Sequence, residues 1–136
     1  MESTMNRQRK FRVWDKMRLQ FIYPENDNQQ HFIIDLNGRF YNLQNGSGDN
    51  DYVVQEYTGL IDKYDNPIYE GDIVKYKTWT GSHDGTTEEH QTQVQFKDGA
   101  YYPRYIDDEC EDSWYSFKVY DLEVIGNIFE TPYLLK

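Results

Sequence analysis

Apolar and polar residues alternate over short stretches along most of the chain, which is the pattern of half-buried β-strands. The alternation predicts strands over residues 11–15, 17–23 and 52–57, with a hairpin turn at Asp15-Lys16 and a loop over residues 24–30. No long segment repeats its apolar positions every three to four residues, as an amphipathic helix does. The elements therefore predict a mainly β protein.

The clearest local signal is Asn37-Gly38, which lies between the apolar runs 31–36 and 39–43. Asparagine and glycine readily adopt the two positive φ angles of a type I′ turn. The sequence therefore predicts a two-residue β-hairpin at this point, followed by a polar connector over residues 45–51.

From Thr58 onward, closely spaced turns predict short strands in an antiparallel sheet that closes on itself as a small barrel. Breaks are expected at residues 58–60, which include Gly59, at residues 65–67 and at residues 70–71. Gly71 and Asp72 are the key pair, because a glycine with positive φ lets the chain reverse just before an alternating strand over residues 72–77.

The remaining segments continue this pattern of strands and turns. Asp98-Gly99 predicts a second tight hairpin between residues 91–97, where Val94 and Phe96 are expected to face inward, and residues 100–105. Pro103 favours an edge position for the second of these strands. The other expectations are a long exposed loop over residues 79–89, an acidic loop over 107–113, strands over 114–120 and 122–128, and one helical turn from Thr131-Pro132 to Leu135.

The length of 136 residues is typical of a single domain. We expect a short N-terminal tail over residues 1–6 and one β domain over residues 7–136. Within that domain we distinguish a hairpin region, residues 7–57, from a barrel region, residues 58–136. The chain has one cysteine, Cys110, and neither a signal peptide nor an apolar run of membrane-spanning length is expected, so the predicted location is a reducing cytoplasm.

Charge is distributed unevenly along the chain. The formal net charge is −10, which argues against duplex nucleic acid as a partner. The first eighteen residues are nevertheless basic, and we expect these cations to pair with acidic surface of the same chain or of a neighbouring subunit. Aromatic residues make up 17% of the sequence and are expected mainly in the core. The residues singled out for a role in interaction are Arg7, Arg9, Lys10, Arg12, Trp14 and Trp79.

The sequence contains no catalytic or metal-binding signature. His31, His83 and His90 have no close cysteine partners and no zinc-protease spacing. The acidic run 107–112 lacks the alternation and the glycine of a calcium loop, and its carboxylates disfavour a thiolate at Cys110. We therefore predict no catalytic residues, no metal site, no cofactor and no small-molecule substrate.

Four separated blocks stand out along the chain: residues 5–16, 57–63, 68–74 and 123–130, the last of which contains Gly126 as a further expected turn glycine. In this order they resemble the signature blocks of the YopX family of phage and prophage proteins. The resemblance implies an SH3-like β-barrel in the later part of the chain and a phage or prophage origin. We expect the N-terminal hairpins to pack against this barrel. In such proteins the pattern starts at the methionine that is Met5 in this chain, so residues 1–4 resemble an extension. The resemblance implies no activity.

Two classes of function remain ahead of an enzyme. The first is a non-enzymatic interaction module that assembles with itself, as a homo-oligomer, or with another protein in the bacterial cytoplasm, because exposed strand edges, tyrosine and tryptophan favour interfaces. The second is an acidic mimic of nucleic acid that occupies a nucleic-acid-binding protein. Binding of single-stranded nucleic acid through the basic start with Phe11 and Trp14 is a weaker third alternative.

Overall fold

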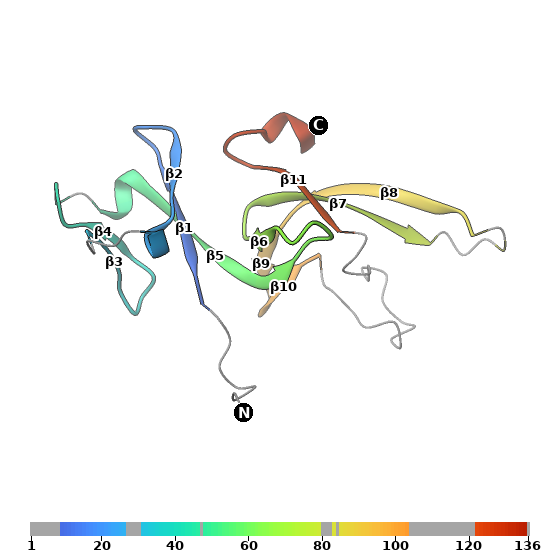
Figure 1. Cartoon of the computed structure of the whole chain (residues 1–136), viewed down its shortest axis with the longest axis horizontal. Helices are drawn as coiled ribbons and strands as arrows, with labels where there is room; N and C mark the ends of the chain where they lie inside the picture. The colour runs from blue at the N-terminus through green and yellow to red at the C-terminus, as the bar shows by residue number, and fades with distance from the viewer. Residues whose placement is uncertain are drawn as a thin grey trace, which may run out of the picture. The chain divides into compact units, whose positions relative to one another are not determined.

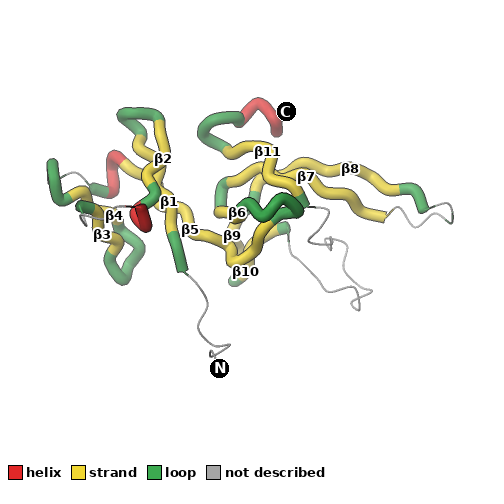
Figure 2. Tube along the Cα trace, viewed as in Figure 1, coloured by secondary structure: helices red, strands yellow, loops and turns green. Residues whose placement is uncertain are grey.

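The structure of the chain is a computed structural model that describes residues 9–26, 31–46, 48–79, 83, 85–103 and 122–135. Side chains of residues 49, 78 and 79 lie outside that description, as do the expected tail 1–6, the acidic run 107–112 and the expected strand 114–120. Every regular element of the described residues is a β-strand or a single turn of 3-10 helix, so the chain is mainly β, as predicted (Figure 2).

The elements follow one another along the chain as short strands, most of which join an antiparallel neighbour (Figure 1). The strands are β1 (Phe11–Asp15), β2 (Gln20–Ile22), β3 (Phe32–Ile34), β4 (Phe40–Asn42), β5 (Tyr52–Ile61), β6 (Pro67–Tyr69), β7 (Asp72–Trp79), β8 (Thr87–Gln93), β9 (Gln95–Lys97), β10 (Ala100–Tyr102) and β11 (Glu123–Asn127). The 3-10 turns are η1 (Pro24–Asn26), η2 (Asp49–Asp51) and η4 (Pro132–Leu135).

The chain divides into two compact units, residues 1–57 and residues 58–136. In the first unit, β1 lies between β2 and the first half of β5, and β3 pairs with β4 in a separate hairpin. Val13, Phe40 and Tyr52 form the buried core of this unit. Alternation along the strands explains this core, because every second side chain of β1 and β4 points to the same face.

The β3–β4 hairpin corrects the predicted type of turn. Gly38 has φ of +81°, but Asn37 has no positive φ, and the loop holds three residues, Leu36, Asn37 and Gly38. Gly38 N donates to Asp35 O at 3.0 Å, and the backbone NH groups of Asn37 and Arg39 donate to Asp35 Oδ1. The Asp35 carboxylate therefore stabilises a wider turn in which only glycine adopts positive φ, and the predicted two-residue type I′ turn is wrong at this hairpin.

The β1–β2 turn is also longer than the expected reversal at Asp15-Lys16. Leu19 has φ of +54° and its NH donates to Asp15 O at 2.8 Å, so the second strand begins at Gln20. The Asp15 carboxylate is buried and accepts hydrogen bonds from Met17 N and Arg18 N. These bonds hold residues 16–19 as a tight four-residue loop.

In the second unit, β7 lies between β11 and β8, and β9 pairs with β10. Its buried core contains Ile68, Val74, Tyr76, Val94 and Leu122. Asp98 has φ of +52° and Gly99 has φ of +80°, with Lys97 and Ala100 directly paired. This two-residue loop has the positive φ angles of a type I′ turn.

The structure corrects several expectations for this unit. Gly59 has φ of +90° within β5, so this glycine bends a continuous strand and does not separate two strands. The expected loop 79–89 is shorter, because β7 and β8 stay paired as far as Trp79 and Thr87. Val94 is buried, but Phe96 is 52% exposed. Val94 lies between β8 and β9, where its NH donates to Asp72 O and its carbonyl accepts from Gly71 N. Because the strand is interrupted at this residue, the inward-outward alternation expected over residues 91–97 does not continue to Phe96.

Two glycines have distinct roles in this unit. Gly71 has φ of +87°, and its NH and carbonyl bond to Val94 O and Ile128 N in the reversal before β7. Gly126 has no left-handed φ and lies within β11, at an irregularity in its pairing with β7, so the expectation that it forms a turn is wrong. A Cβ at Gly126 would overlap Thr131 Oγ1 and lie 2.9 Å from Leu134 Cδ1, so this position needs glycine for the close approach of η4.

Candidate functional site

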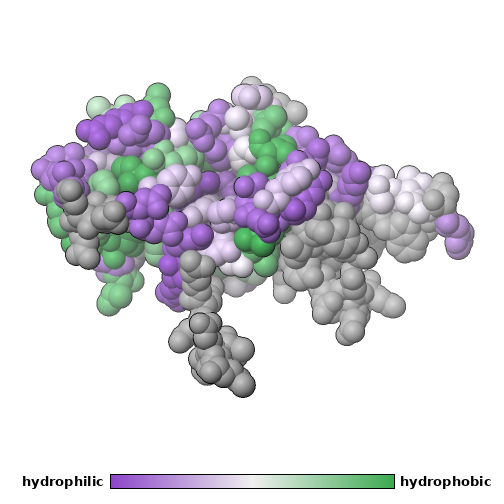
Figure 3. All heavy atoms as spheres, viewed as in Figure 1, coloured by the Kyte–Doolittle hydropathy of each residue, from purple (hydrophilic) through white to green (hydrophobic). Residues whose placement is uncertain are grey.

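The β3–β4 hairpin exposes an apolar patch on its outer face. Ile33 and Tyr41 are directly paired across the two strands, and their side chains are 45% and 39% exposed. Leu43 follows β4 and is 58% exposed, while Leu36 at the tip of the hairpin is fully exposed. We call Ile33, Leu36, Tyr41 and Leu43 the hairpin patch; Figure 3 shows hydrophobic surface at this end of the first unit.

Alternation places these side chains opposite the core of the first unit. Phe32 and Phe40 point inward, where their rings stack at 5.4 Å between centroids, and Phe40 is fully buried. The run Phe32-Ile33-Ile34 is apolar throughout, so one of its three side chains must point away from that core. Sequence reasoning did not single out Ile33, although three consecutive apolar residues in a short strand are a signal for an apolar outer face.

The charges beside the hairpin patch offset each other. Residues 31–43 hold one acidic side chain, Asp35, and one permanently basic side chain, Arg39. The pKa of Asp35 lies below its usual value, mainly because the carboxylate accepts a hydrogen bond from the backbone NH of Arg39. Burial raises this pKa. The Asn37 NH, the positive charge of Arg39 and the Tyr41 hydroxyl lower it further. The hairpin therefore presents apolar surface with no net charge.

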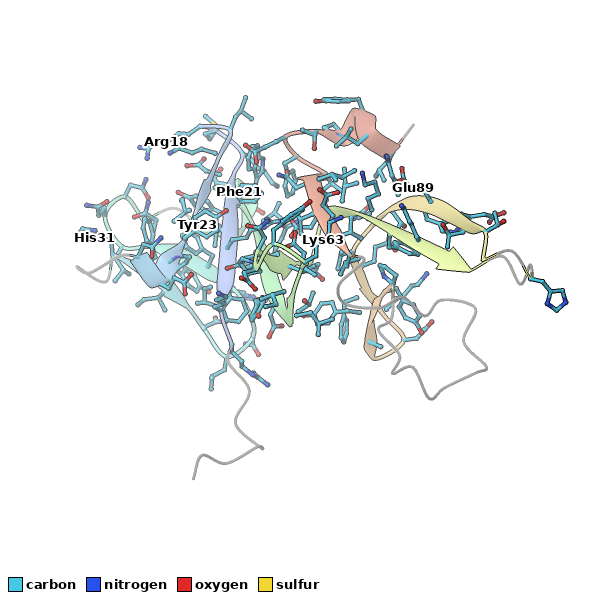
Figure 4. The ribbon with its side chains drawn as sticks, turned by 45° about the vertical axis from the view of Figure 1, so that its right-hand side comes forward. Arg18, Phe21, Tyr23, His31, Lys63 and Glu89 are labelled. Carbon is cyan, nitrogen blue, oxygen red and sulfur yellow. The ribbon has the colours of Figure 1, made fainter. Side chains whose placement is uncertain are left out.

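The residues that the sequence singled out for interaction do not form one surface in the described part of the chain. Arg12 and Trp14 are only 5% and 7% exposed. The Arg12 guanidinium lies 4.4 Å from the centre of the Phe21 ring and its Nε donates to Gln55 Oε1 at 2.8 Å. Both side chains contribute mainly to the interior, and Phe21, labelled in Figure 4, covers part of them.

Of the other residues expected to take part in interaction, the structure describes Arg9 and Lys10 completely and Trp79 only in its backbone. Lys10 Nζ lies 4.6 Å from the centre of the Tyr57 ring, and Arg9 is exposed. Arg7 lies outside the described residues, and the backbone of Trp79 ends β7 while its side chain is not described.

Each unit has a surface cavity that is lined by described residues. One has a volume of about 290 Å³, and Asp15, Met17, Arg18, Asn45, Asp51 and Tyr52 line it. The Asp15 carboxylate is engaged by the backbone of its own turn, so it is held as part of the loop. The other cavity belongs to the second unit, has a volume of about 130 Å³, and is lined by Lys63, Lys75, Tyr76, Lys77 and Glu89.

Asp62 is a buried carboxylate that organises the turn after β5. Its Oδ1 accepts hydrogen bonds from Tyr64 N and Asn66 N, and its Oδ2 accepts one from Val124 N at 3.0 Å. Burial raises the pKa of Asp62, but the backbone NH groups of Val124, Asn66 and Tyr64 outweigh burial and lower it below its usual value. The carboxylate is therefore ionised and attaches this turn to β11.

The histidines lie apart in the described residues. His90 stacks on Tyr76 at 5.2 Å between ring centres and lies 4.0 Å from Glu88, while His31 meets the edge of Phe32 and His83 is exposed. Within the described ranges, no three histidine, cysteine, aspartate or glutamate side chains converge as metal ligands. No helix in the same residues has the length and apolar character needed to cross a membrane. Cys110 lies outside them.

Comparison with known proteins identifies the family. A family model described as YopX protein matches residues 10–136, nearly the whole chain. The chain belongs to the YopX family. No curated protein matches the chain. Among solved structures, the chain is similar to the crystal structure of protein EF1440 from Enterococcus faecalis, with 25% sequence identity, a TM-score of 0.55, and coverage of 96% of this chain and 100% of that chain.

The YopX blocks recognised in the sequence span both strands and turns: residues 5–16 include β1, and residues 123–130 include β11. Residues 57–63 include Gly59 and Asp62, residues 68–74 include Gly71 and Asp72, and residues 123–130 include Gly126. The Asp72 carboxylate is buried and accepts a hydrogen bond from Tyr69 N at 2.8 Å across the Gly71 reversal. The Asp62 and Asp72 carboxylates thus stabilise backbone geometry within these blocks, and the exposed hairpin patch lies between the first two blocks.

Proposed function

We propose that this YopX-family protein is a non-enzymatic assembly module and that the hairpin patch binds a second copy of the same chain. The exposed apolar face of the β3–β4 hairpin is the observation that carries the proposal. Contiguous exposed apolar surface commonly marks protein interfaces, and burial of this surface against another copy would remove it from water.

The distribution of charge favours a second copy as the occupant. The first unit holds seven basic and eight acidic side chains, a net charge of −1, whereas the second unit holds seven basic and sixteen acidic side chains, a net charge of −9. Like charges repel when two identical surfaces meet, so a symmetric contact between copies costs least at the nearly neutral unit. The hairpin patch belongs to that unit.

Strand geometry adds a second means of association. In the described residues, β3 and β4 form a sheet of two strands only. The outer edges of such a sheet can accept a strand from another chain, which is a common mode of assembly. The hairpin patch consists of four side chains, whereas stable interfaces use about 20–30 residues on each partner, so we expect weak association that depends on concentration.

Sedimentation velocity over concentrations from about 1 μM to about 1 mM tests this proposal, because weak interfaces dissociate within this range. We expect the wild type to shift from monomer to dimer, and the double variant Ile33→Ser/Leu43→Ser to remain a monomer. Leu135→Ser is a matched control, since Leu135 is an aliphatic residue of similar exposure, 42%, in the second unit. A wild type that stays monomeric, or a double variant that dimerises equally well, would refute the proposal.

The finer parts of the proposal follow from the family. Membership of the YopX family supports a phage or prophage origin, an SH3-like barrel in residues 58–136 and action in the cytoplasm of a bacterial host. The net charge of −10 also suits mimicry of nucleic acid, but no particular acidic surface of the described residues favours that function over assembly. Binding of single strands has less support, because Trp14 is almost completely buried.

A further inference from the structure

We infer that the cavity lined by Lys63, Lys75 and Lys77 is a binding site for a small phosphate-bearing anion. This inference is independent of the proposed assembly function and concerns only residues of the second unit. That unit holds only seven basic side chains, and three of them line this single cavity. Because the unit has a net charge of −9, such a concentration of cations is the feature that requires an explanation.

Sheet geometry places two of the cations side by side. Lys75 and Lys77 are two residues apart on β7, so their side chains leave the same face of the sheet, about 6.6 Å apart along the strand. Val74 and Tyr76 point to the opposite face, into the core of the second unit. The two lysines therefore face away from that core and into the cavity.

Tertiary contacts bring the third cation from a distant segment. Lys63 follows β5, and its NH donates to Leu122 O at 3.0 Å, just before β11. The neighbouring Asp62 carboxylate binds Val124 N in β11, and β11 pairs with β7 through Glu123 and Lys75. These bonds fix the backbone at Lys63 close to the strand that carries the other two lysines (Figure 4).

The ion pairs of the cavity leave cations available for a ligand. Lys75 Nζ lies 3.4 Å from Glu123 Oε2. Among the described residues, no carboxylate lies within 4.0 Å of the ammonium groups of Lys63 or Lys77, even though Glu89 is the register partner of Lys77 and also lines the cavity. Three lysines against Glu89 and Glu123 leave one excess positive charge in an otherwise acidic unit.

The size of the cavity and the kind of cation indicate the class of ligand. A volume of about 130 Å³ is several times the ~30 Å³ that one water molecule occupies in the liquid. Lysine ammonium groups are compact point charges with three donors each, and a phosphoryl group offers three oxygens to three such groups, whereas a carboxylate offers two. Among the described lining residues only Tyr76 is aromatic, and its ring packs in the core on the opposite face of β7, against His90, so no base-stacking surface accompanies the charges.

Titration with inorganic pyrophosphate, followed by NMR of the lysine side chains and by thermal shift, tests the site. A ligand that binds the folded state stabilises it in a saturable manner. Each of Lys63→Gln and Lys77→Gln is expected to weaken binding about fivefold, because one exposed charge contact contributes up to about 1 kcal/mol. Glu89→Gln is expected to tighten binding by a similar factor, since it removes a negative charge from the cavity, and an unfolded variant cannot produce that result.

Lys97→Gln is the matched control. Lys97 Nζ lies 5.1 Å from the centre of the Tyr102 ring, much as Lys63 Nζ lies 5.2 Å from that of Tyr64, but Lys97 does not line the cavity. This variant should bind pyrophosphate as the wild type does. If the natural ligand is a free phosphate compound, ADP should bind the wild type no more tightly than pyrophosphate does. If ADP bound more tightly than pyrophosphate and its binding depended on the same lysines, the natural ligand would be a nucleotide. Absence of saturable pyrophosphate binding, equal weakening by Lys97→Gln, or no effect of Glu89→Gln would overturn the inference.

Discussion

Gly126→Ala is the substitution whose effect the structure defines most directly. The added methyl group would overlap Thr131 Oγ1 and lie 2.9 Å from Leu134 Cδ1. Thr131 Oγ1 cannot move freely, because it accepts a hydrogen bond from Asn127 N at 3.0 Å and donates to Asn127 O at 3.2 Å. The change must therefore displace η4 from β11 or break these bonds.

The expected cost is about 3 kcal/mol, the upper end of the usual range for overpacking, because the obstructing atom is held by the backbone. Chemical denaturation of the wild type and the variant measures this difference, and the melting temperature should fall by roughly 10 °C. In a double-mutant cycle with Thr131→Ala, Gly126→Ala should cost at least about 1 kcal/mol less than in the wild-type background, since the overlapping oxygen is then absent.

Gly38→Ala is the control for backbone effects. An added Cβ at Gly38 meets nothing within 4 Å, so its cost comes only from the positive φ of +81° and should be about 1 kcal/mol. If Gly126→Ala cost less than Gly38→Ala, or cost the same with and without the Thr131 side chain, the proposed close approach of η4 would be incorrect.

Three further predictions concern the folded core and its turns. The pKa of Asp62 lies below its usual value of 3.8 in the folded state, so this carboxylate stabilises the fold above that pH and the contribution is lost as the pH falls through the folded pKa. Chemical denaturation at several pH values from 6 to 2.5 measures the free energy of unfolding of the wild type and of Asp62→Asn. The difference between them should be about 1–3 kcal/mol at pH 6 and should shrink at the acidic end. A difference that stayed constant would contradict a lowered pKa of Asp62 in the folded state. Gly71→Val should cost about 1–3 kcal/mol by thermal denaturation, because φ is +87°, whereas Gly48→Ala, which makes only ordinary contacts, should be nearly neutral. Phe40→Ala should cost about 3–5 kcal/mol by urea denaturation, since the Phe40 ring is fully buried against Tyr52, and a loss below about 1 kcal/mol would mean that this core is not formed.

Local sequence was sufficient for most strands and for some turns. The alternation at residues 11–15 corresponds to β1, and Asp98-Gly99 has the two positive φ angles expected of that pair. The same reasoning was wrong for Asn37-Gly38, because the Asp35 side chain binds two backbone NH groups and widens the turn. A side chain outside the two turn residues decided the loop, and the dipeptide alone does not report it.

The candidate sites were less accessible to sequence reasoning. Three successive apolar residues, 32–34, indicate that one apolar side chain of this strand faces outward. Which of them does so depends on the register with β4, and in the structure it is Ile33. Lys75 and Lys77 have the spacing of one strand face, whereas Lys63 joins them only through hydrogen bonds to residues about 60 positions later in the chain.

The amino-acid sequence by itself determined the mainly β character, the YopX family and the local backbone preferences, such as positive φ at Gly71, because these depend on periodicity and on residues close together in the chain. The tertiary structure alone decided that Phe96 is exposed, that Gly126 accommodates η4, and that three lysines share one cavity. The physical reason is that burial and proximity depend on which distant segments pack together. That choice is set by the sum of many weak contacts, and no short stretch of sequence contains it.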